Sequence, residues 1–337
     1  MPRTLSVLFA LCVTLLGYSC AAVAAPAPPA WHEVARLRAG QTAGPVALAG
    51  RWAFVPNMGD GTVTQIDRAA RRVVATIRIS EPKVLLDQGC APTNTHAYFY
   101  GSWGLRECNT PFALGWDGSS LWAIDNGLKQ LIRIDPVAHA AVDRIDLPGK
   151  AWDISIVGTT GWLSGYWDDA LYKVDLAQKR VVAEIDGLDH GPAALLATAD
   201  SVWVLCTRAG RLSRINVGDS KVAAIYPVEP WSVDVVPAVS AIFVRGTDGG
   251  DISRLSAADG AVQWTKPGPK AAGYYGVDHV GIAPNGLWLS GPTTARINLS
   301  TGEIAERISR ASMAASFESD ELWLIGLDGS VSEYVQS

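Results

Sequence analysis

The stretch 120–147, SLWAIDNGLKQLIRIDPVAHAAVDRIDL, sets the pattern for the rest of the chain. Its short apolar runs at 121–124, 130–134 and 141–145 are separated by the turn signals Asn-Gly (126–127) and Asp-Pro (135–136). Apolar runs of this length, rich in β-branched residues and bounded by such dipeptides, are typical of strands. The stretch therefore predicts three consecutive strands of one small sheet.

This pattern recurs along the chain in whole or in part. Each unit carries one aromatic residue inside an apolar run, at Trp52, Trp122, Trp162, Trp203, Phe243, Trp288 and Trp323. From 122 to 243 these residues stand 40, 41 and 40 positions apart, and a further apolar run precedes each of them. A period near ~40 with several short strands is typical of a β-propeller blade. We predict an all-β fold of seven four-stranded antiparallel blades, with the aromatic residues in the core.

The two chain ends predict how the ring closes. The chain stops shortly after the third strand of the last unit, near Tyr334. The first apolar segment, 33–37, has the pattern of a fourth strand, but no first, second or third strand precedes it. Pairing the two ends would remove two exposed sheet edges. We therefore expect the N-terminal strand to complete the last blade.

The N-terminus has the features of a secretion signal. Arg3 precedes an apolar run at 5–16, and Ala22-Val23-Ala24 forms a small-x-small cleavage pattern. The run is shorter than the ~20 residues that span a bilayer, and the residues before Cys20 make a poor lipoprotein signal. We expect a signal peptide at 1–24, a Pro-rich spacer at 25–30 and one propeller at 31–337. The product would be periplasmic or extracellular after cleavage near Ala24.

One insertion, at 80–110, interrupts the repeat between the first two units. Cys90 and Cys108 flank it, and an oxidising compartment permits disulfides, so we predict that they pair. Cys206 lies in an apolar run and is predicted to be a buried free thiol. The insertion also carries Tyr98 and Trp103, and it joins the face on which each fourth strand connects to the next blade.

Three pairs of segments carry a family resemblance: Leu121-Trp122 with 133–135 (RID), Val202-Trp203 with 214–216 (RIN), and Leu287-Trp288 with 296–298 (RIN). Over 31–337 the chain resembles the YVTN and streptogramin-lyase-like (virginiamycin B lyase-like) seven-bladed propellers. That resemblance implies a catalytic His at the start of the first strand of a late blade, a position near that of His279. The Trp-Phe-Thr-Glu of those lyases is replaced here by Trp-Leu-Ser-Gly at 288–291.

Two histidines are candidate catalytic residues. His190 and His279 each follow an aspartate, Asp189 and Asp278, and each precedes or opens a predicted channel-lining strand. A carboxylate that orients an imidazole can make it a general base or a metal ligand. Because neighbours in an extended chain point to opposite faces, the partner need not be the preceding aspartate. The alternative is that these residues only satisfy backbone groups at the channel mouth.

Aromatic residues and carboxylates share the insertion-bearing face of the predicted ring. Such a mixture suits a sugar ring or a flat organic cation, and the alternative is packing between blades. The candidate ligand-binding residues are Trp152, Asp153, Trp167, Asp168, Trp231, Tyr274, Tyr275, Tyr98 and Trp103. The repeated Asp67, Asp135 and Asp175 end strands, so we expect them to cap turns rather than to bind metal.

The charge of the chain and the absence of several motifs exclude some classes of function. The 337 residues include 28 Lys plus Arg and 33 Asp plus Glu, with no basic stripe, which argues against a nucleic-acid partner. The chain lacks C-x-x-C-H, phosphate-loop, G-x-S-x-G and H-E-x-x-H motifs. We predict an exported, monomeric, non-enzymatic propeller that binds a small molecule or an exported protein. The alternative is a lyase or hydrolase that uses His279, Asp278 or His190, with or without a divalent metal.

Overall fold

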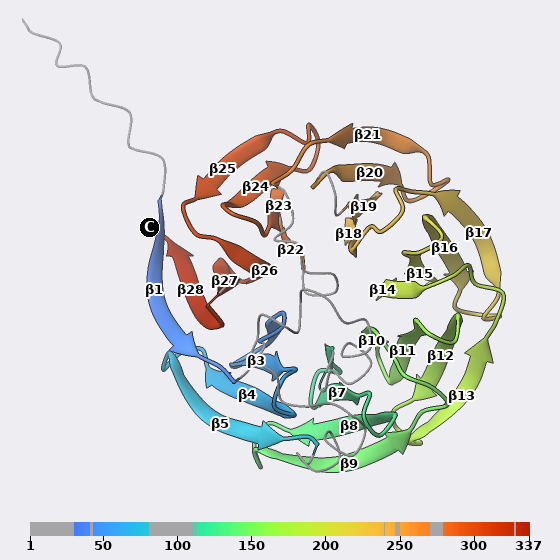
Figure 1. Ribbon diagram of the computed structural model, residues 1–337, viewed down its shortest axis with the longest axis horizontal. Coiled ribbons are helices and arrows are strands. Elements are labelled where there is room, and N and C mark those ends of the chain that lie inside the picture. Colours follow the sequence, from blue (N-terminus) through green and yellow to red (C-terminus); the bar gives the residue numbers. More distant parts are fainter. Residues whose placement is uncertain are drawn as a thin grey trace, which may run out of the picture.

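A computed structural model describes residues 30–40, 43–80, 111, 113–238, 240–246, 250–269, 279–326 and 328–337. The strands in these ranges form seven four-stranded sheets arranged around one axis (Figure 1). The prediction of an all-β, seven-bladed propeller is therefore confirmed. No helix in the described part of the chain is long and apolar enough to cross a membrane. The predicted signal peptide, the spacer except Ala30, and residues 81–110 of the insertion lie outside the described residues.

The strands follow one another from the hub to the rim in blades 1 to 6. Blade 1 contains β2 (Ala47–Ala49), β3 (Trp52–Asn57), β4 (Thr62–Asp67) and β5 (Arg72–Arg78). Blade 2 contains β6 (Leu114–Trp116), β7 (Leu121–Asp125), β8 (Gln130–Asp135) and β9 (Ala140–Asp146). Blade 3 contains β10 (Ile154–Val157), β11 (Thr160–Gly165), β12 (Ala170–Asp175) and β13 (Arg180–Ile185). Blade 4 contains β14 (Pro192–Ala197), β15 (Ser201–Cys206), β16 (Arg211–Asn216) and β17 (Val222–Pro227).

The remaining blades continue around the ring. Blade 5 contains β18 (Asp234–Ala238), β19 (Ala241–Arg245), β20 (Ile252–Ser256) and β21 (Val262–Lys266). Blade 6 contains β22 (Gly281–Ala283), β23 (Gly286–Leu289), β24 (Thr294–Asn298) and β25 (Ile304–Ile308). Blade 7 contains β26 (Ser312–Glu318), β27 (Glu321–Gly326), β28 (Ser330–Gln336) and β1 (Trp31–Arg38).

The hydrophobic core lies between neighbouring blades. Strand β7 is buried along its whole length, whereas the rim strand β9 consists of half-buried and exposed residues, with only Ile145 buried. A strand covered on both faces needs apolar residues throughout, and a rim strand needs them on one face only. Trp122 of blade 2 packs in one cluster with Leu163 and Tyr172 of blade 3. Stacking of blades therefore buries the repeated aromatic residues.

The aromatic residue of blade 1 is Phe54, and the prediction that Trp52 holds this position is wrong. Trp122 pairs with Arg133 on the next strand, and Phe54 pairs with Gln65 at the same register. Trp52 pairs with the strand-ending Asp67 and is only half-buried, with the Arg51 guanidinium 4.7 Å from its ring centroid. The hairpin before Trp52 has the same two-residue connection as that of blade 3, since Ala49 pairs with Trp52 as Val157 pairs with Thr160. Trp52 therefore stands at the first position of β3, and the core position follows two residues later.

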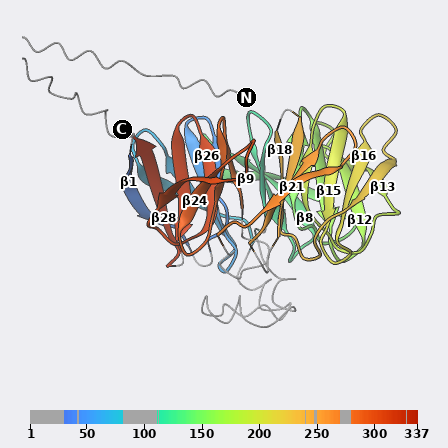
Figure 2. The ribbon, with the colours of Figure 1, turned by 90° about the horizontal axis from the view of Figure 1, so that it is seen from above.

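The N-terminal strand closes the ring, as predicted. β1 pairs antiparallel with β28, from Trp31 opposite Gln336 to Arg38 opposite Ser330. Figure 1 shows this pair at the edge of blade 7, beside blade 1, and Figure 2 shows the flat ring from above its edge. The sheet of the last blade is therefore built from both ends of the described chain.

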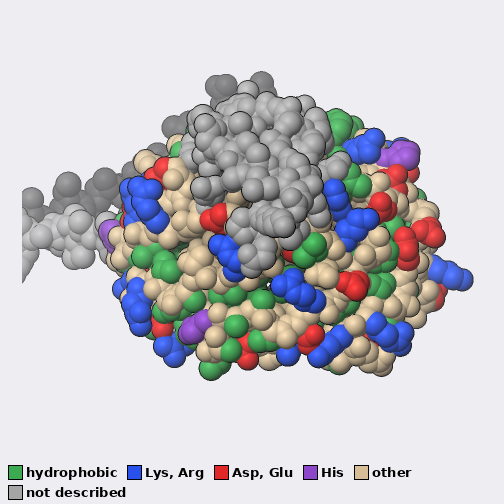
Figure 3. Space-filling model, turned by 60° about the horizontal axis from the view of Figure 1, so that its bottom comes forward, with side chains coloured by type: hydrophobic (Ala, Val, Ile, Leu, Met, Phe, Trp, Pro, Cys, Tyr) green, Lys and Arg blue, Asp and Glu red, His purple; other side chains and the backbone are tan. Residues whose placement is uncertain are grey.

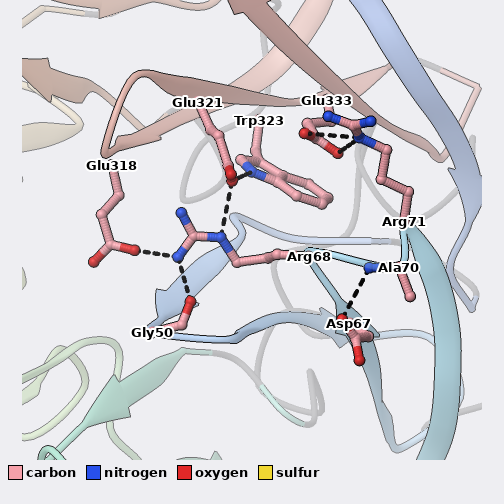
Figure 4. A network of polar contacts seen from close by, with 9 residues as sticks. All are labelled: Gly50, Asp67, Arg68, Ala70, Arg71, Glu318, Glu321, Trp323 and Glu333. Atoms are coloured by element: carbon pink, nitrogen blue, oxygen red, sulfur yellow. Dashed lines mark hydrogen bonds and ion pairs between the residues drawn. The ribbon is translucent and has the colours of Figure 1, made fainter.

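An ionic network also joins blades 1 and 7 (Figure 4). The Arg68 guanidinium is 8% exposed; it contacts Glu318, donates to Glu321 Oε2 at 2.9 Å and to the Gly50 carbonyl at 2.6 Å. Arg71 Nε lies 3.2 Å from the buried Glu333. Because a buried guanidinium needs several acceptors, this set stabilises one relative position of the two blades.

The strand-ending aspartates cap turns, as predicted. Asp67 Oδ1 accepts the Ala70 N–H at 3.0 Å, and Asp135 Oδ1 accepts the Val137 N–H at 2.7 Å. Asp175 Oδ1 accepts the Gln178 N–H at 2.8 Å. Backbone N–H donors are the main cause that holds the pKa of Asp135 below its usual value.

Candidate functional site in the central channel

Seven equivalent positions surround the channel, one from each blade. Each lies nine residues before the repeated aromatic residue, and two residues before the inner-strand residue that pairs with it. In blade order they are Pro45, Ala113, Asp153, Ala194, Asp234, His279 and Ala314. Because the inner strands all stand beside the axis in Figure 1, these positions form one ring, the channel ring.

A cavity of about 150 Å³ occupies the channel at this level. All members of the channel ring except Ala314 line it. The polar members come from blades 3, 5 and 6, whereas blades 1 and 2 contribute the apolar side chains Pro45, Val46, Pro56 and Leu114. The cavity therefore has one charged side and one apolar side.

Asp234 and His279 form a pair at the cavity. His279 Nδ1 lies 3.2 Å from Asp234 Oδ2, and the imidazole is 46% exposed. The buried Asp234 is itself fixed, because Oδ1 accepts the Val235 N–H and Oδ2 accepts the Val280 N–H, both at 2.8 Å. A carboxylate at Nδ1 favours the tautomer that leaves Nε2 as an acceptor. Because His279 lines the cavity, its imidazole can contact a molecule bound there.

Asp153 has the same backbone bonds as Asp234, two blades earlier. Asp153 Oδ1 accepts the N–H of the following residue, Ile154, at 2.8 Å. Asp153 Oδ2 accepts the Leu195 N–H of the next blade at 3.0 Å. Both aspartates therefore link their own inner strand to the next blade, and both keep charge at the channel wall.

Burial and neighbouring charges shift two pKa values in the cavity. Burial is the largest influence on Asp153 and raises its pKa to about 6; the Asp234 charge adds to this, while the N–H donors of Leu195 and Ile154 oppose it. For His279, burial is again the largest single influence and disfavours the imidazolium. The charge and hydrogen bond of Asp234, together with the charge of Asp153, outweigh that effect and raise the pKa of His279.

His190 lies elsewhere on the ring and does not line the cavity. Its Nδ1 is 2.6 Å from Asp169 Oδ2, and its side chain is 76% exposed. Asp169 Oδ1 also accepts the Gly191 N–H at 2.8 Å. As predicted, neither His190 nor His279 needs the preceding aspartate, because each has a carboxylate partner from another part of the chain.

The aromatic and acidic residues that were predicted to bind a ligand divide into two groups. Trp152 and Asp153 line the cavity, and Trp152 packs 5.9 Å from Trp167 between ring centroids. Asp168 Oδ2 instead accepts the Tyr172 hydroxyl at 2.6 Å, which is a bond within blade 3. Trp231 adopts a left-handed backbone conformation (φ 63°) and is not part of the cavity lining.

Several predicted site residues lie outside the described residues. They are Asp278, Tyr274, Tyr275, Tyr98, Trp103, Cys90 and Cys108. Cys206 is described, and it is a buried free thiol, as predicted. Burial raises the pKa of this thiol to about 12, which keeps it protonated and unreactive.

Asp234 is the cavity residue that sequence reasoning missed. It stands nine residues before Phe243, as Asp153 does before Trp162 and His279 before Trp288. A search at this one offset would have found all three. The described ranges contain no group of three His, Cys, Asp or Glu side chains arranged to hold a metal.

Comparisons with known proteins place the chain by fold. Residues of this chain superpose on hydrazine synthase of Kuenenia stuttgartiensis with a TM-score of 0.67 and 13% identity, covering 88% of this chain and 96% of that one. The Cps50 (Swd1) β-propeller domain of Myceliophteria thermophila gives a TM-score of 0.68 at 13% identity, covering 90% and 99%. No protein-family model and no curated protein sequence matches the chain. At this identity the likeness shows the propeller fold alone.

Proposed function

We propose that the protein binds a small molecule in the central cavity, and that Asp153, Asp234 and His279 recognise it. The observation that carries this proposal is the gathering of the channel ring's titratable side chains, from blades 3, 5 and 6, around one cavity. A small, mostly apolar cavity with a few convergent polar groups is the usual form of a ligand site. The proposed site lies where the inner strands begin.

A second candidate function is proton transfer by the Asp234–His279 pair. Its support is an imidazole that lines the cavity and has a buried carboxylate beside Nδ1. A histidine held in this way can remove a proton from a bound substrate. His279 also stands just before β22, the first strand of blade 6, near the position of the catalytic His in the streptogramin-lyase-like propellers that the sequence resembles.

The test of the binding function is a calorimetric and thermal-shift screen of the full mature chain with sugars, lactones and amines. At least one class should bind, and Asp234→Asn should weaken that binding at least tenfold. Asp169→Asn is the matched control, because it removes a carboxylate that pairs with a histidine outside the cavity. Equal loss in both variants, or no loss in Asp234→Asn, would contradict the assignment of the site.

His279→Gln separates the two candidate functions. A binding protein should show a changed affinity and no turnover in either form. A lyase should convert a bound lactone or ester, and His279→Gln should bind that compound while losing at least a hundredfold in turnover, since a general base contributes about 10²–10⁴-fold. Product analysis by mass spectrometry distinguishes these results.

We also propose that the chain is exported and cleaved near Ala24. Support comes from the Arg3 and 5–16 pattern, followed by the small residues at 22–24. N-terminal sequencing of the mature protein should begin at Ala25. Thiol titration of the unfolded mature protein should find one free thiol, that of Cys206; three free thiols would contradict the proposed Cys90–Cys108 disulfide.

A further inference from the structure

The two sides of the cavity differ in the kind of ligand group that they can hold. Asp234 has His279 beside it, whereas no Lys or Arg of the described ranges forms an ion pair with Asp153. Asp153 accepts two backbone N–H groups, which stabilise the carboxylate but bring no full positive charge. Partly buried charges in proteins are usually paired. The cavity lining therefore holds two carboxylates and one imidazole, and a positively charged group on a ligand would balance the second carboxylate.

The opposite side offers only apolar contact. Pro45, Val46 and Pro56 of blade 1, with Ala113 and Leu114 of blade 2, supply no side-chain donor or acceptor. A volume of about 150 Å³ holds only a compact molecule. A ligand that satisfies both sides has one charged end and a short apolar body.

We propose that the ligand is a compact organic cation, an amine or a quaternary ammonium, whose charge faces Asp153 and Asp234 and whose apolar body lies against blades 1 and 2. This inference rests on the proposed binding function and names its ligand class. Trp152 forms part of the cavity wall and does not offer an open ring face. Its indole is only 7% exposed, and its ring centroid lies 4.6 Å from that of Tyr166.

The same contacts argue against a sugar. A sugar ring needs an open aromatic face and several hydrogen-bonding partners, but Trp152 is covered by its aromatic neighbours. Each oxygen of Asp153 and Asp234 already accepts one backbone N–H, so these side chains can accept few of the hydrogen bonds that a sugar would donate. The hydroxyls of a sugar would lose water against proline and alanine without replacement, at a cost of about 1–3 kcal/mol each. An anion would face two carboxylates.

Cation binding should depend on pH. The titratable groups that line the cavity are Asp153, Asp234 and His279. At pH 5 both Asp153 and His279 are largely protonated, because the pKa of each is raised, so the cavity carries little net negative charge. At pH 7.5 Asp153 is ionised, which adds one negative charge to the cavity. Affinity for a cation should therefore rise at least tenfold from pH 5 to pH 7.5.

The experiment compares tetramethylammonium with tert-butanol, which has a similar size and shape but no charge. Isothermal titration of the full mature chain at pH 7.5 should show tetramethylammonium binding at least tenfold more tightly than tert-butanol. Asp153→Asn should remove most of that preference, and the control Asp169→Asn should keep it. Ala113→Leu fills the cavity from the apolar side without removing a blade-to-blade bond, and it should abolish binding. This variant keeps the proposal testable if Asp153→Asn does not fold.

The outcomes separate the two proposals. Equal affinity for tetramethylammonium and tert-butanol, or tighter binding of a sugar that Ala113→Leu blocks, would overturn the cation class and leave the binding function in place. Binding of tetramethylammonium that neither Ala113→Leu nor Asp153→Asn weakens would overturn the proposed location, and with it the cation proposal. If neither these probes nor any sugar, lactone or amine binds the wild-type chain, both proposals are wrong.

Discussion

The described part of the propeller contains two histidine–aspartate pairs, and their surroundings differ. His190 and Asp169 meet in the open, with side chains 76% and 32% exposed. His279 and Asp234 meet at the cavity, where Asp234 is buried and Asp153 adds a second carboxylate. The distances between the paired atoms, 2.6 Å and 3.2 Å, would favour the exposed pair. Burial rather than distance therefore decides which pair has consequences for stability and binding.

The difference follows from what each carboxylate holds. Asp169 Oδ1 accepts one loop N–H, from Gly191. Asp234 accepts an N–H from its own strand and one from blade 6, so it takes part in the contact between blades. Water can replace the bonds of an exposed group, but it cannot reach buried donors, which then remain unsatisfied. The following predictions test this contrast.

Asp234→Ala should give the largest effect. It leaves the Val235 and Val280 N–H groups without an acceptor, so we expect a loss of about 2–4 kcal/mol in the free energy of unfolding. Asp169→Ala, the matched change in the exposed pair, should cost about 1 kcal/mol or less. Urea unfolding followed by tryptophan fluorescence measures both. Equal costs would show that burial does not separate the two pairs.

Asp153 should make stability depend on pH. Its folded-state pKa of about 6 is above the ordinary value of 3.8, so it favours the folded state when protonated. This contribution is fully present below about pH 4 and is lost as the pH rises through about 6, a change of about 1–3 kcal/mol. The free energy of unfolding of the wild type and of Asp153→Asn, measured at several pH values, isolates the contribution of Asp153. A difference between the two proteins that is constant from pH 4 to 7 would contradict the prediction.

His279 should titrate above 6.5, because its pKa is raised by Asp234 and Asp153. Its stabilising contribution is therefore complete below pH 6.5 and is lost as the pH rises through the folded-state pKa. NMR of labelled histidine, assigned with His279→Gln, gives the midpoint. Asp234→Asn should lower the midpoint, because it removes the largest of the influences that raise this pKa. A wild-type midpoint below 6.5 would show that burial, not charge, dominates.

His190→Ala should have the smallest effect. An exposed ion pair contributes about 0–1 kcal/mol, so we expect a change below about 0.5 kcal/mol in unfolding and none in the binding of tetramethylammonium. Unfolding and tetramethylammonium binding of His190→Ala should be measured together with those of His279→Ala under the same conditions. A larger effect of His190→Ala on binding would place the ligand site at the exposed pair.

The fold could be predicted from the sequence because its signals are local and repeated. The strand-and-turn pattern at 120–147 recurs with a nearly constant period, and the segment 33–37 lacks the strands that would precede it in a blade. Both features follow from which residues form strands and turns. The choice of Trp52 failed because blade 1 has two aromatic residues in the same strand, and the register places Phe54, not Trp52, at the core position.

The site was harder to predict because its bonds join distant parts of the chain. Asp234 and His279 are brought together only by the neighbouring positions of blades 5 and 6. In the sequence His190 looks like His279, since each follows an aspartate. They differ in their offset from the aromatic residue: His279 lies nine residues before Trp288, and His190 lies thirteen before Trp203. Only correct alignment of all seven units, with Phe54 in the first, makes this offset informative.

The pairing of β1 with β28 also determines how the molecule responds to mechanical force. Trp31, at the start of β1, is opposite Gln336, near the end of β28, so both ends of the described chain leave the sheet at the same corner. Pulling the two ends apart would load the hydrogen bonds between these strands one pair at a time, beginning at that corner, rather than all together in shear. Tension would therefore separate β1 from β28 first and open the propeller ring at blade 7.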